Sequence, residues 1–340
     1  MVVRIAPPIR RLAGSAQLVN TPGQAYNAAM RVGWICHDDF LLHDTREDHP
    51  ERPERLTRIR EGLAERGLLD QLIPIPFDAA SPQALAMIHD PAYIDLVRMA
   101  CESGFTFIGS YDNPICPRSY EVARLAVGGV VAACDAAMAG TVDRAFCAVR
   151  PPGHHAETDQ AMGFCLFNNV AIAAEHLVRS HKLTRVAIVD LDVHHGNGTQ
   201  HIFESRGDVL FISLHERGIY PGTGHESEAG VGPGEGFTLN IPLLGGSDEK
   251  TYRRAIENRV LPRLDDFQPQ FIILSMGFDT YREERIAHMN LEADSFGPLT
   301  RSLVEAADRH CRGHLVSVLE GGYWQSALGR CAAAHVAAMM

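Results

Sequence analysis

Short apolar runs alternate with longer amphipathic segments along most of the chain. The longer segments, 118–139, 168–181, 248–264 and 295–311, carry apolar residues at the spacing that predicts helices. Short apolar runs bounded by polar turns are typical of parallel strands that are covered by helices on both faces. We therefore predict one α/β domain over residues 30–340 with a mostly parallel central sheet. The strand candidates are 31–36, 72–77, 145–149, 185–191, 209–214, 271–276 and 315–319.

Polar clusters follow five of these predicted strands directly. "RPPGHH" follows 145–149, "DVHHGNG" follows 185–191 and "HERGIYPGTG" follows 209–214, while "GFD" follows 271–276 and "EGGY" follows 315–319. The carboxyl ends of parallel strands lie along one edge of an open sheet, and ligands bind at that edge. We expect the five clusters to form a single site.

The stretch "DLDVHH" offers metal ligands. Strand alternation would place Asp190, Asp192 and His194 on one side of the strand. Of these, Asp192 and His194 could hold one metal ion, and Asp279 at a neighbouring strand end would be the third ligand. Two carboxylates and one imidazole leave an open coordination position, as in catalytic zinc sites, although iron(II) or cobalt(II) would also fit these ligands. A single Asp or His at a strand end is more often a cap, but this combination favours a metal site.

Two adjacent histidines and a tyrosine could handle protons beside that metal. His154 and His155 would act as base and acid if each ring had a partner on its far nitrogen, and Asp190 and Asn197 are the candidates. An aspartate partner favours imidazolium, whereas an asparagine orients the ring without adding charge. Tyr323, behind two glycines, could donate a hydrogen bond to a developing oxyanion.

Composition narrows the class of protein. The net charge of −11 provides no basic surplus for phosphate binding, so we expect no direct contact with nucleic acid. Eight cysteines without a C-x-x-C pair suit a reducing compartment, and no apolar run is long enough to span a membrane, so we expect a cytoplasmic protein. Residues 1–29 carry three arginines and no acidic residue; we interpret them as a flexible extension or a non-native start, with a targeting peptide as the alternative.

Taken together, the motifs resemble the histone deacetylase superfamily, in particular its class II-like bacterial amidohydrolases and acetylpolyamine amidohydrolases. The resemblance runs from about residue 31 to the end of the chain and implies the three-layer arginase/deacetylase fold. The matching motifs, in family order, are "HPERPERL" (49–56), "RPPGHHA" (150–156), "MGFCLFNN" (162–169), "DLDVHHGNGTQHIF" (190–203), "ISLH" (212–215), "YPGTG" (220–224), "GFD" (277–279) and "EGGY" (320–323).

The resemblance implies a role for each motif residue. Zinc would be held by Asp192, His194 and Asp279; His155 would be the general base, with Asn197 as its partner; Asp190 would orient His154, and Tyr323 would polarise the acyl oxygen. A monovalent cation, potassium, would bind at Asp190, Ser213 and Leu214, together with backbone oxygens of Asp192 and His194. The substrate channel would be lined by Phe164, Tyr220, Gly163 and Gly322. Ile286 and Asp112 would lie at the mouth of that channel.

The expected function is hydrolysis of acetyl-lysine or a similar N-acyl amine. Asn197 stands where class I relatives carry an aspartate, and aliphatic Ile286 stands where polyamine-specific relatives can present an acidic group. An acetylpolyamine or other small-amide deacetylase, a non-catalytic acyl-lysine reader and a dimanganese ureohydrolase are the alternatives. The ureohydrolase requires D-x-H-x-D clusters, whereas this chain has D-x-D-x-H. The acyl chain, the physiological substrate and a homo-oligomeric state stay open.

Overall fold

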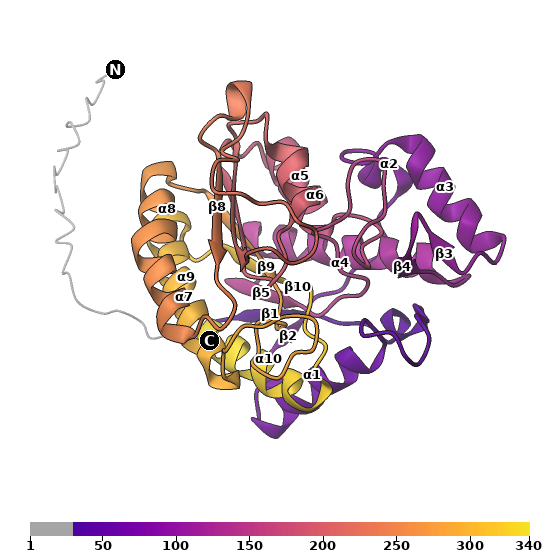
Figure 1. Ribbon diagram of the computed structural model, residues 1–340, viewed down its shortest axis with the longest axis horizontal. Helices are drawn as coiled ribbons and strands as arrows, with labels where there is room; N and C mark the ends of the chain where they lie inside the picture. Colours follow the sequence, from indigo (N-terminus) through magenta and orange to yellow (C-terminus); the bar gives the residue numbers. More distant parts are fainter. Residues whose placement is uncertain (1–29) are drawn as a thin grey trace, which may run out of the picture.

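An eight-stranded sheet, parallel throughout, forms the centre of the computed structural model, which describes residues 30–340 (Figure 1). The prediction for residues 1–29 lies outside the described part. The spatial order of the strands is β2-β1-β5-β10-β9-β6-β7-β8. Their bounds are β1 Val32–Ile35, β2 Ile73–Pro74, β5 Arg144–Cys147, β6 Val186–Asp190, β7 Val209–Glu216, β8 Thr238–Leu243, β9 Phe271–Met276 and β10 Leu315–Leu319.

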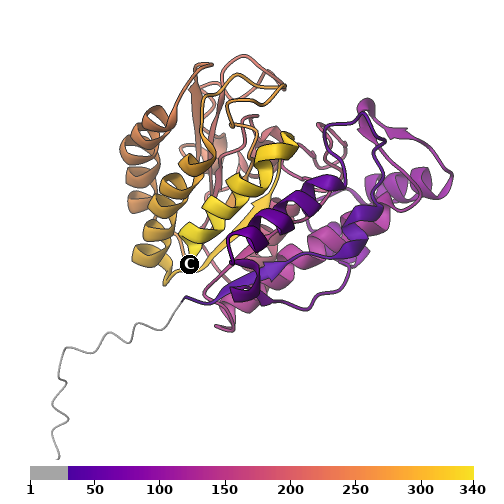
Figure 2. The same ribbon diagram turned by 90° about the horizontal axis from the view of Figure 1, so that it is seen from below.

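Helices cover both faces of the sheet and make three layers, which Figure 2 shows from a second side. On one face, α4 packs against α5, β1, β5 and β10, while on the other α10 packs against α1 and α9. The helix bounds are α1 Glu54–Glu65, α4 Ser119–Met138, α5 Asn169–Ser180, α6 Asn197–Phe203, α7 Glu249–Ala255, α8 Leu261–Phe267, α9 Phe296–Cys311 and α10 Gln325–Met339; a π-helical turn, Ile256–Val260, joins α7 to α8.

The central strands are apolar because both of their faces are buried. Every residue of β5, β6, β7, β9 and β10 is buried, which explains why these five segments were readable as continuous apolar runs. Burial of each Val, Ile or Leu side chain contributes about 1.5–3 kcal/mol before conformational entropy is counted. The rigid, fully buried strands provide a firm base for the loops at their carboxyl ends.

The periphery departs from the predicted elements. The run 72–77 was expected to be a strand, but only Ile73–Pro74 pairs with β1, because Pro74 and Pro76 cannot donate to a ladder. The strand β8 was not predicted; it contains Pro242 and forms the opposite edge of the sheet. A lobe beside the sheet, also unpredicted, contains α2 Pro82–Leu85, α3 Pro91–Glu102 and the hairpin of β3 Phe107–Ile108 and β4 Ser110–Pro114.

Within residues 30–340, none of the helices combines the length and the apolar character that a membrane crossing requires.

Candidate active site and metal centre

Three buried ligands converge just beyond the ends of β6 and β9. His194 Nδ1 lies 3.1 Å from Asp192 Oδ1 and 3.3 Å from Asp279 Oδ2. One ligand atom from each of these residues lies within 4.8 Å of the others, and all three residues are buried. The structure thus brings together residues that are 87 positions apart in the sequence at most, in the arrangement of a mononuclear metal site.

Backbone hydrogen bonds, rather than strand alternation, orient these ligands. The strand β6 ends at Asp190, so the alternation that we predicted through His194 does not apply beyond that residue. Instead, Asp190 Oδ1 accepts the backbone N–H of Asp192 at 3.0 Å, and Asp192 Oδ1 accepts that of His194 at 2.9 Å. These local bonds turn the chain at each step and replace the sheet ladder. From β9, Asp279 Oδ1 accepts the N–H of Val193 at 3.0 Å.

The residues at this site fit a divalent metal ion. Asp279 Oδ2 is buried without a hydrogen-bond partner, which is costly unless a cation satisfies it. Burial and the nearby charge of Asp192 raise the pKa of Asp279 above its ordinary value, because two buried carboxylate charges repel each other and a cation between them would relieve that repulsion. Gly321 allows the approach of both carboxylates, since a Cβ there would lie 2.0 Å from Asp279 Oδ2. Two carboxylates and one imidazole are ligands that zinc accepts in catalytic sites.

The adjacent histidines have different partners. His154 Nδ1 lies 2.9 Å from Asp190 Oδ2, and His155 Nδ1 lies 2.7 Å from Asn197 Oδ1. The two ring centroids are 4.0 Å apart, so the rings face the same space rather than diverging. Burial lowers the pKa of His154, but the charges of Asp190 and Asp192 outweigh it and raise that pKa to about 10. Burial and the charge of His154 hold the pKa of His155 well below its ordinary value.

Tyr323 lies at the opening of the site, in the loop after β10. Its ring packs against the guanidinium of Arg55 at 4.9 Å and against the edge of Phe164 at 5.8 Å. Arg55 also donates to the carbonyl oxygen of Gly322 at 2.8 Å, while Glu284 accepts the backbone N–H of Tyr323 at 2.8 Å. Burial raises the pKa of the phenol well above its ordinary value, so Tyr323 stays a hydrogen-bond donor at neutral pH.

Sequence comparison assigns this arrangement to a family. The histone deacetylase domain family matches residues 49–339. The chain belongs to the histone deacetylase family. It is 43% identical over 289 residues to the histone deacetylase-like amidohydrolase of Pseudomonas aeruginosa, a match that covers 85% of this chain and 76% of the relative. It is 38% identical over 297 residues to a probable deacetylase of Archaeoglobus fulgidus, covering 86% of this chain and 82% of the relative.

A human relative and a solved structure extend the comparison. The chain is 37% identical to the human polyamine deacetylase HDAC10 over 312 residues, which cover 86% of this chain and 46% of that protein. The crystal structure of the HDA15 HD domain superposes with a TM-score of 0.87 at 36% identity, covering 91% of this chain and 88% of that one. The expected superfamily and its three-layer α/β fold are therefore confirmed, and the sheet is parallel throughout rather than mostly parallel.

The residues expected to line the deacetylase channel lie around the histidines and the phenol. The ring of Tyr220 meets that of His155 edge-on at 5.1 Å, and Gly163 makes room for both, since a Cβ there would lie 2.3 Å from His155 Cδ2 and 3.0 Å from Tyr220 Cε1. The Phe164 ring lies 4.6 Å from that of His49 and 5.8 Å from that of Tyr323, so it contacts both. Gly322 adopts φ +110° against Phe278 and thereby directs Tyr323 to the opening.

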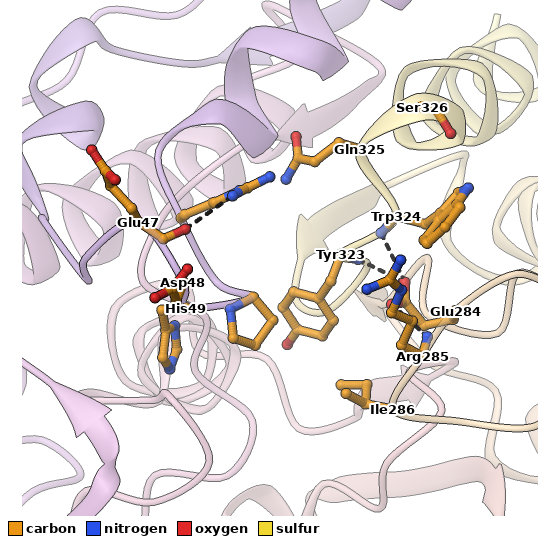
Figure 3. A pocket seen from close by; sticks show the side chains of 12 residues that line it. Glu47, Asp48, His49, Glu284, Arg285, Ile286, Tyr323, Trp324, Gln325 and Ser326 are labelled. Atoms are coloured by element: carbon orange, nitrogen blue, oxygen red, sulfur yellow. Dashed lines mark hydrogen bonds between the residues drawn. The ribbon is translucent and has the colours of Figure 1, made fainter.

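A pocket of 510 Å³ borders Tyr323 and His49 on the outer side of the site and is shown in Figure 3. Ile286 and Tyr323 project towards the same opening, and the Ile286 side chain is 36% exposed. Asp112 lies in β4 near Tyr220. Burial and the charge of Asp112 together raise the pKa of the Tyr220 hydroxyl above its ordinary value. The pocket lining consists of Glu47, Asp48, His49, Pro50, Arg52, Glu284, Arg285, Ile286, Tyr323, Trp324, Gln325 and Ser326.

The residues expected to hold a monovalent cation lie on neighbouring strands. Asp190 of β6 is in register with Ser213 of β7, and both residues and Leu214 are fully buried. Asp190 already accepts from Asp192 and pairs with His154, and the Ser213 hydroxyl lies 2.9 Å from His215 Nδ1. The positions of Asp190, Ser213 and Leu214 are compatible with a monovalent cation, but the Asp190 and Ser213 side chains already have partners within the protein.

Sequence reasoning missed two sets of residues that hold the site together. Glu157 Oε1 accepts from Asn197 Nδ2 at 2.6 Å and lies 2.8 Å from His201 Nδ1. Glu51 binds Arg150 through both carboxylate oxygens and Arg55 through one, with all three side chains fully buried. Glu51 lies within the motif "HPERPERL" and Glu157 directly follows "RPPGHHA", so the sequence drew attention to both regions. Arg150 and Asn197, the partners that these glutamates bind across the site, are distant from them in the sequence and could be identified only from the fold.

Proposed function

We propose that the protein is a zinc-dependent amidohydrolase that removes an acyl group, in the first instance acetyl, from a lysine side chain or a similar amine. The observation that supports this most directly is the buried triad of Asp192, His194 and Asp279 beside two histidines with unlike partners. Zinc bound by this triad would polarise the acyl carbonyl and acidify a water molecule. Family membership supports the same reaction class.

In this proposal His155 is the general base. Its Nδ1 is held by Asn197 Oδ1, so the proton of the attacking water passes to Nε2, the free ring nitrogen. The low pKa of His155 keeps the ring neutral and able to accept that proton, whereas His154 is kept as imidazolium by Asp190. The opposite pKa shifts separate the two roles. A histidine imidazolium then returns a proton to the leaving amine.

Tyr323 and Glu157 would support this proton transfer. The Tyr323 hydroxyl would donate to the acyl oxygen as negative charge develops there. Glu157 accepts from the amide nitrogen of Asn197, which fixes the amide with Oδ1 towards His155. The carboxylate missing next to His155, in comparison with class I relatives, is thus present one hydrogen bond further away.

The aliphatic side chain of Ile286, in a pocket that Glu47 and Asp48 also line, is the feature for which we propose a preference for acyl-lysine over acetylpolyamine. Aliphatic Ile286 offers no charge to the distal ammonium of a polyamine. One relative, the human polyamine deacetylase HDAC10, supports the alternative that this chain deacetylates small acetylated amines. Kinetics on an acetyl-lysine peptide and on acetylputrescine separate the two, and a higher kcat/KM on acetylputrescine would reject the preference proposed here.

The reaction itself is tested by metal analysis combined with a deacylation screen. We expect about one catalytic zinc ion per chain, and His155→Ala should abolish turnover while that zinc is retained. Near-wild-type turnover by His155→Ala would contradict the assignment of the base. Stoichiometric binding of acyl-lysine without product release would instead indicate a non-catalytic reader.

A further inference from the structure

A second cluster of metal-ligating side chains lies on the helical layer, away from the catalytic loops. Asp135 is in the last turn of α4, His176 is in α5, and His181 is the residue after α5. His176 Nε2 lies 2.7 Å and His181 Nε2 lies 2.6 Å from the same oxygen, Asp135 Oδ1. One ligand atom from each residue lies within 4.8 Å of the others.

The cluster is separate from the site described above. The N-cap of α5, Asn168, lies beside the histidine loop, since its Nδ2 donates to the carbonyl oxygen of Ala156 at 3.2 Å and to Thr199 of α6 at 3.1 Å. From there the helix runs away from the carboxyl edge, and at about 1.5 Å per residue His176 lies about 12 Å further along it. His181, at the far end of α5, is further still.

We propose that Asp135, His176 and His181 bind a second divalent metal ion, of the zinc, nickel and copper class, that bridges the ends of α4 and α5. Two imidazoles and one carboxylate are ligands that such ions prefer. The side chains are 49%, 18% and 26% exposed in that order, so water can complete the coordination and the ion can enter from solvent.

The local geometry needs only a small adjustment to receive the ion. Metal–nitrogen bonds of about 2.0–2.1 Å separate neighbouring ligands by roughly 3 Å, slightly more than the present nitrogen–oxygen distances. Exposed side chains at a helix end can open by that amount. Ser180 Oγ lies 3.3 Å from His176 Nδ1, and this contact orients the ring with Nε2 towards the cluster, as outer hydrogen bonds do at metal sites.

The experiment is equilibrium dialysis of the full chain against buffered Zn²⁺, with zinc counted per chain. We expect two ions in the wild type, one in His181→Gln and one in Asp135→Asn, with deacetylase activity unchanged in both variants. Asp279→Asn should lose the catalytic ion and keep the distal one. The control is His310→Gln, because His310 makes a single surface pair with Asp265 at 2.7 Å and should bind as the wild type does.

The second readout is thermal unfolding as a function of free Zn²⁺. Because an ion that binds only the folded chain stabilises it, wild type and His310→Gln should show a second rise in Tm that is absent in His181→Gln and Asp135→Asn. A wild type that holds one ion, lost in Asp279→Asn and kept in His181→Gln, would overturn the second site and leave the proposed catalytic site intact. If that single ion were instead lost in His181→Gln and kept in Asp279→Asn, the second site would stand and the proposed catalytic zinc site would be overturned.

Discussion

The catalytic floor and the channel mouth are built in different ways. At the floor, Asp192 and Asp279 are fixed by backbone N–H donors and are entirely buried. At the mouth, Ile286 is a third exposed and Tyr220 is 41% exposed. The floor can change little, because its carboxylates are held by backbone N–H donors and the one carboxylate oxygen without a protein partner, Asp279 Oδ2, is available only to a bound cation. The mouth can vary with substrate, because its side chains face water.

Removing a floor ligand should have the largest effect. Asp279→Ala deletes one of three ligands and the carboxylate that accepts from Val193 N, so we expect zinc to be lost and kcat/KM to fall by at least about 10³-fold. Zinc content and deacetylation should be measured on the same preparation, with circular dichroism to verify folding. A folded, zinc-free variant with more than a tenth of wild-type activity would contradict the metal mechanism.

Glu51 is the shared partner of Arg150 and Arg55 in a fully buried ion cluster, so its removal should affect stability first. Glu51→Gln leaves Arg55 and Arg150 buried without their shared charge, and breaking a buried ion pair in this way costs about 3–5 kcal/mol. We expect a lower midpoint of urea unfolding. Arg98→Ala, which removes an exposed pair with Glu102, is the matched control and should change little. Equal midpoints for the two variants would show that the buried cluster is not structural.

The same carboxylate predicts a pH dependence with a definite sign. Burial raises the pKa of Glu51, but Arg150 and Arg55 outweigh it and hold that pKa below its ordinary value. A carboxyl group of this kind contributes stability that is present above the ordinary pKa and is lost as the pH falls towards the folded value. Wild-type stability should therefore decline on acidification more steeply than that of Glu51→Gln, which equilibrium unfolding between pH 7 and 3 can measure.

The pair of Asn197 and Glu157 should produce an intermediate effect. Glu157→Ala frees the amide that holds His155, and loss of a hydrogen bond to a charged group costs about 1.5–3 kcal/mol, which corresponds to about 10–100-fold in rate. We expect kcat to fall while KM is nearly unchanged. His201→Gln, which removes only the other partner of Glu157, should retain near-wild-type kcat.

A double mutant tests this pair further. Asn197→Asp places a second carboxylate beside Glu157, where the atoms are 2.6 Å apart, and like charges at that distance repel. Glu157→Gln should therefore reduce activity in the wild-type background and restore it in the Asn197→Asp background. Additive losses in the two backgrounds would show that Glu157 does not act through position 197.

Site residues at the ends of buried strands could be predicted from the sequence, whereas residues whose partners lie on distant loops could not. Asp192, His194 and Asp279 follow buried strands, so their position at strand ends was enough to expect them at one edge of the sheet, whereas the backbone bonds that orient them beyond Asp190 could not be predicted. Glu157 could not be assigned, because its partner depends on how the loop after β5 folds over α6. The Arg55 contacts with the loop after β10 join residues 267 positions apart, which no local pattern encodes. The edge strand β8 and the hairpin lobe lack the continuous apolar runs of the centre.

The smallest effect is expected at the mouth, where a single exposed side chain should alter preference without altering chemistry. Ile286→Glu adds a negative charge to the pocket of Figure 3, which Tyr323 also lines, and this charge could pair with the distal ammonium of a polyamine bound at Tyr323. An exposed ion pair contributes about 0.2–1 kcal/mol, so kcat/KM for acetylputrescine should rise up to about fivefold relative to an acetyl-lysine peptide. Ile286→Gln is the control of equal shape without charge. If both variants shift the ratio equally, side-chain size rather than charge at position 286 determines the preference, and the mouth discriminates by shape.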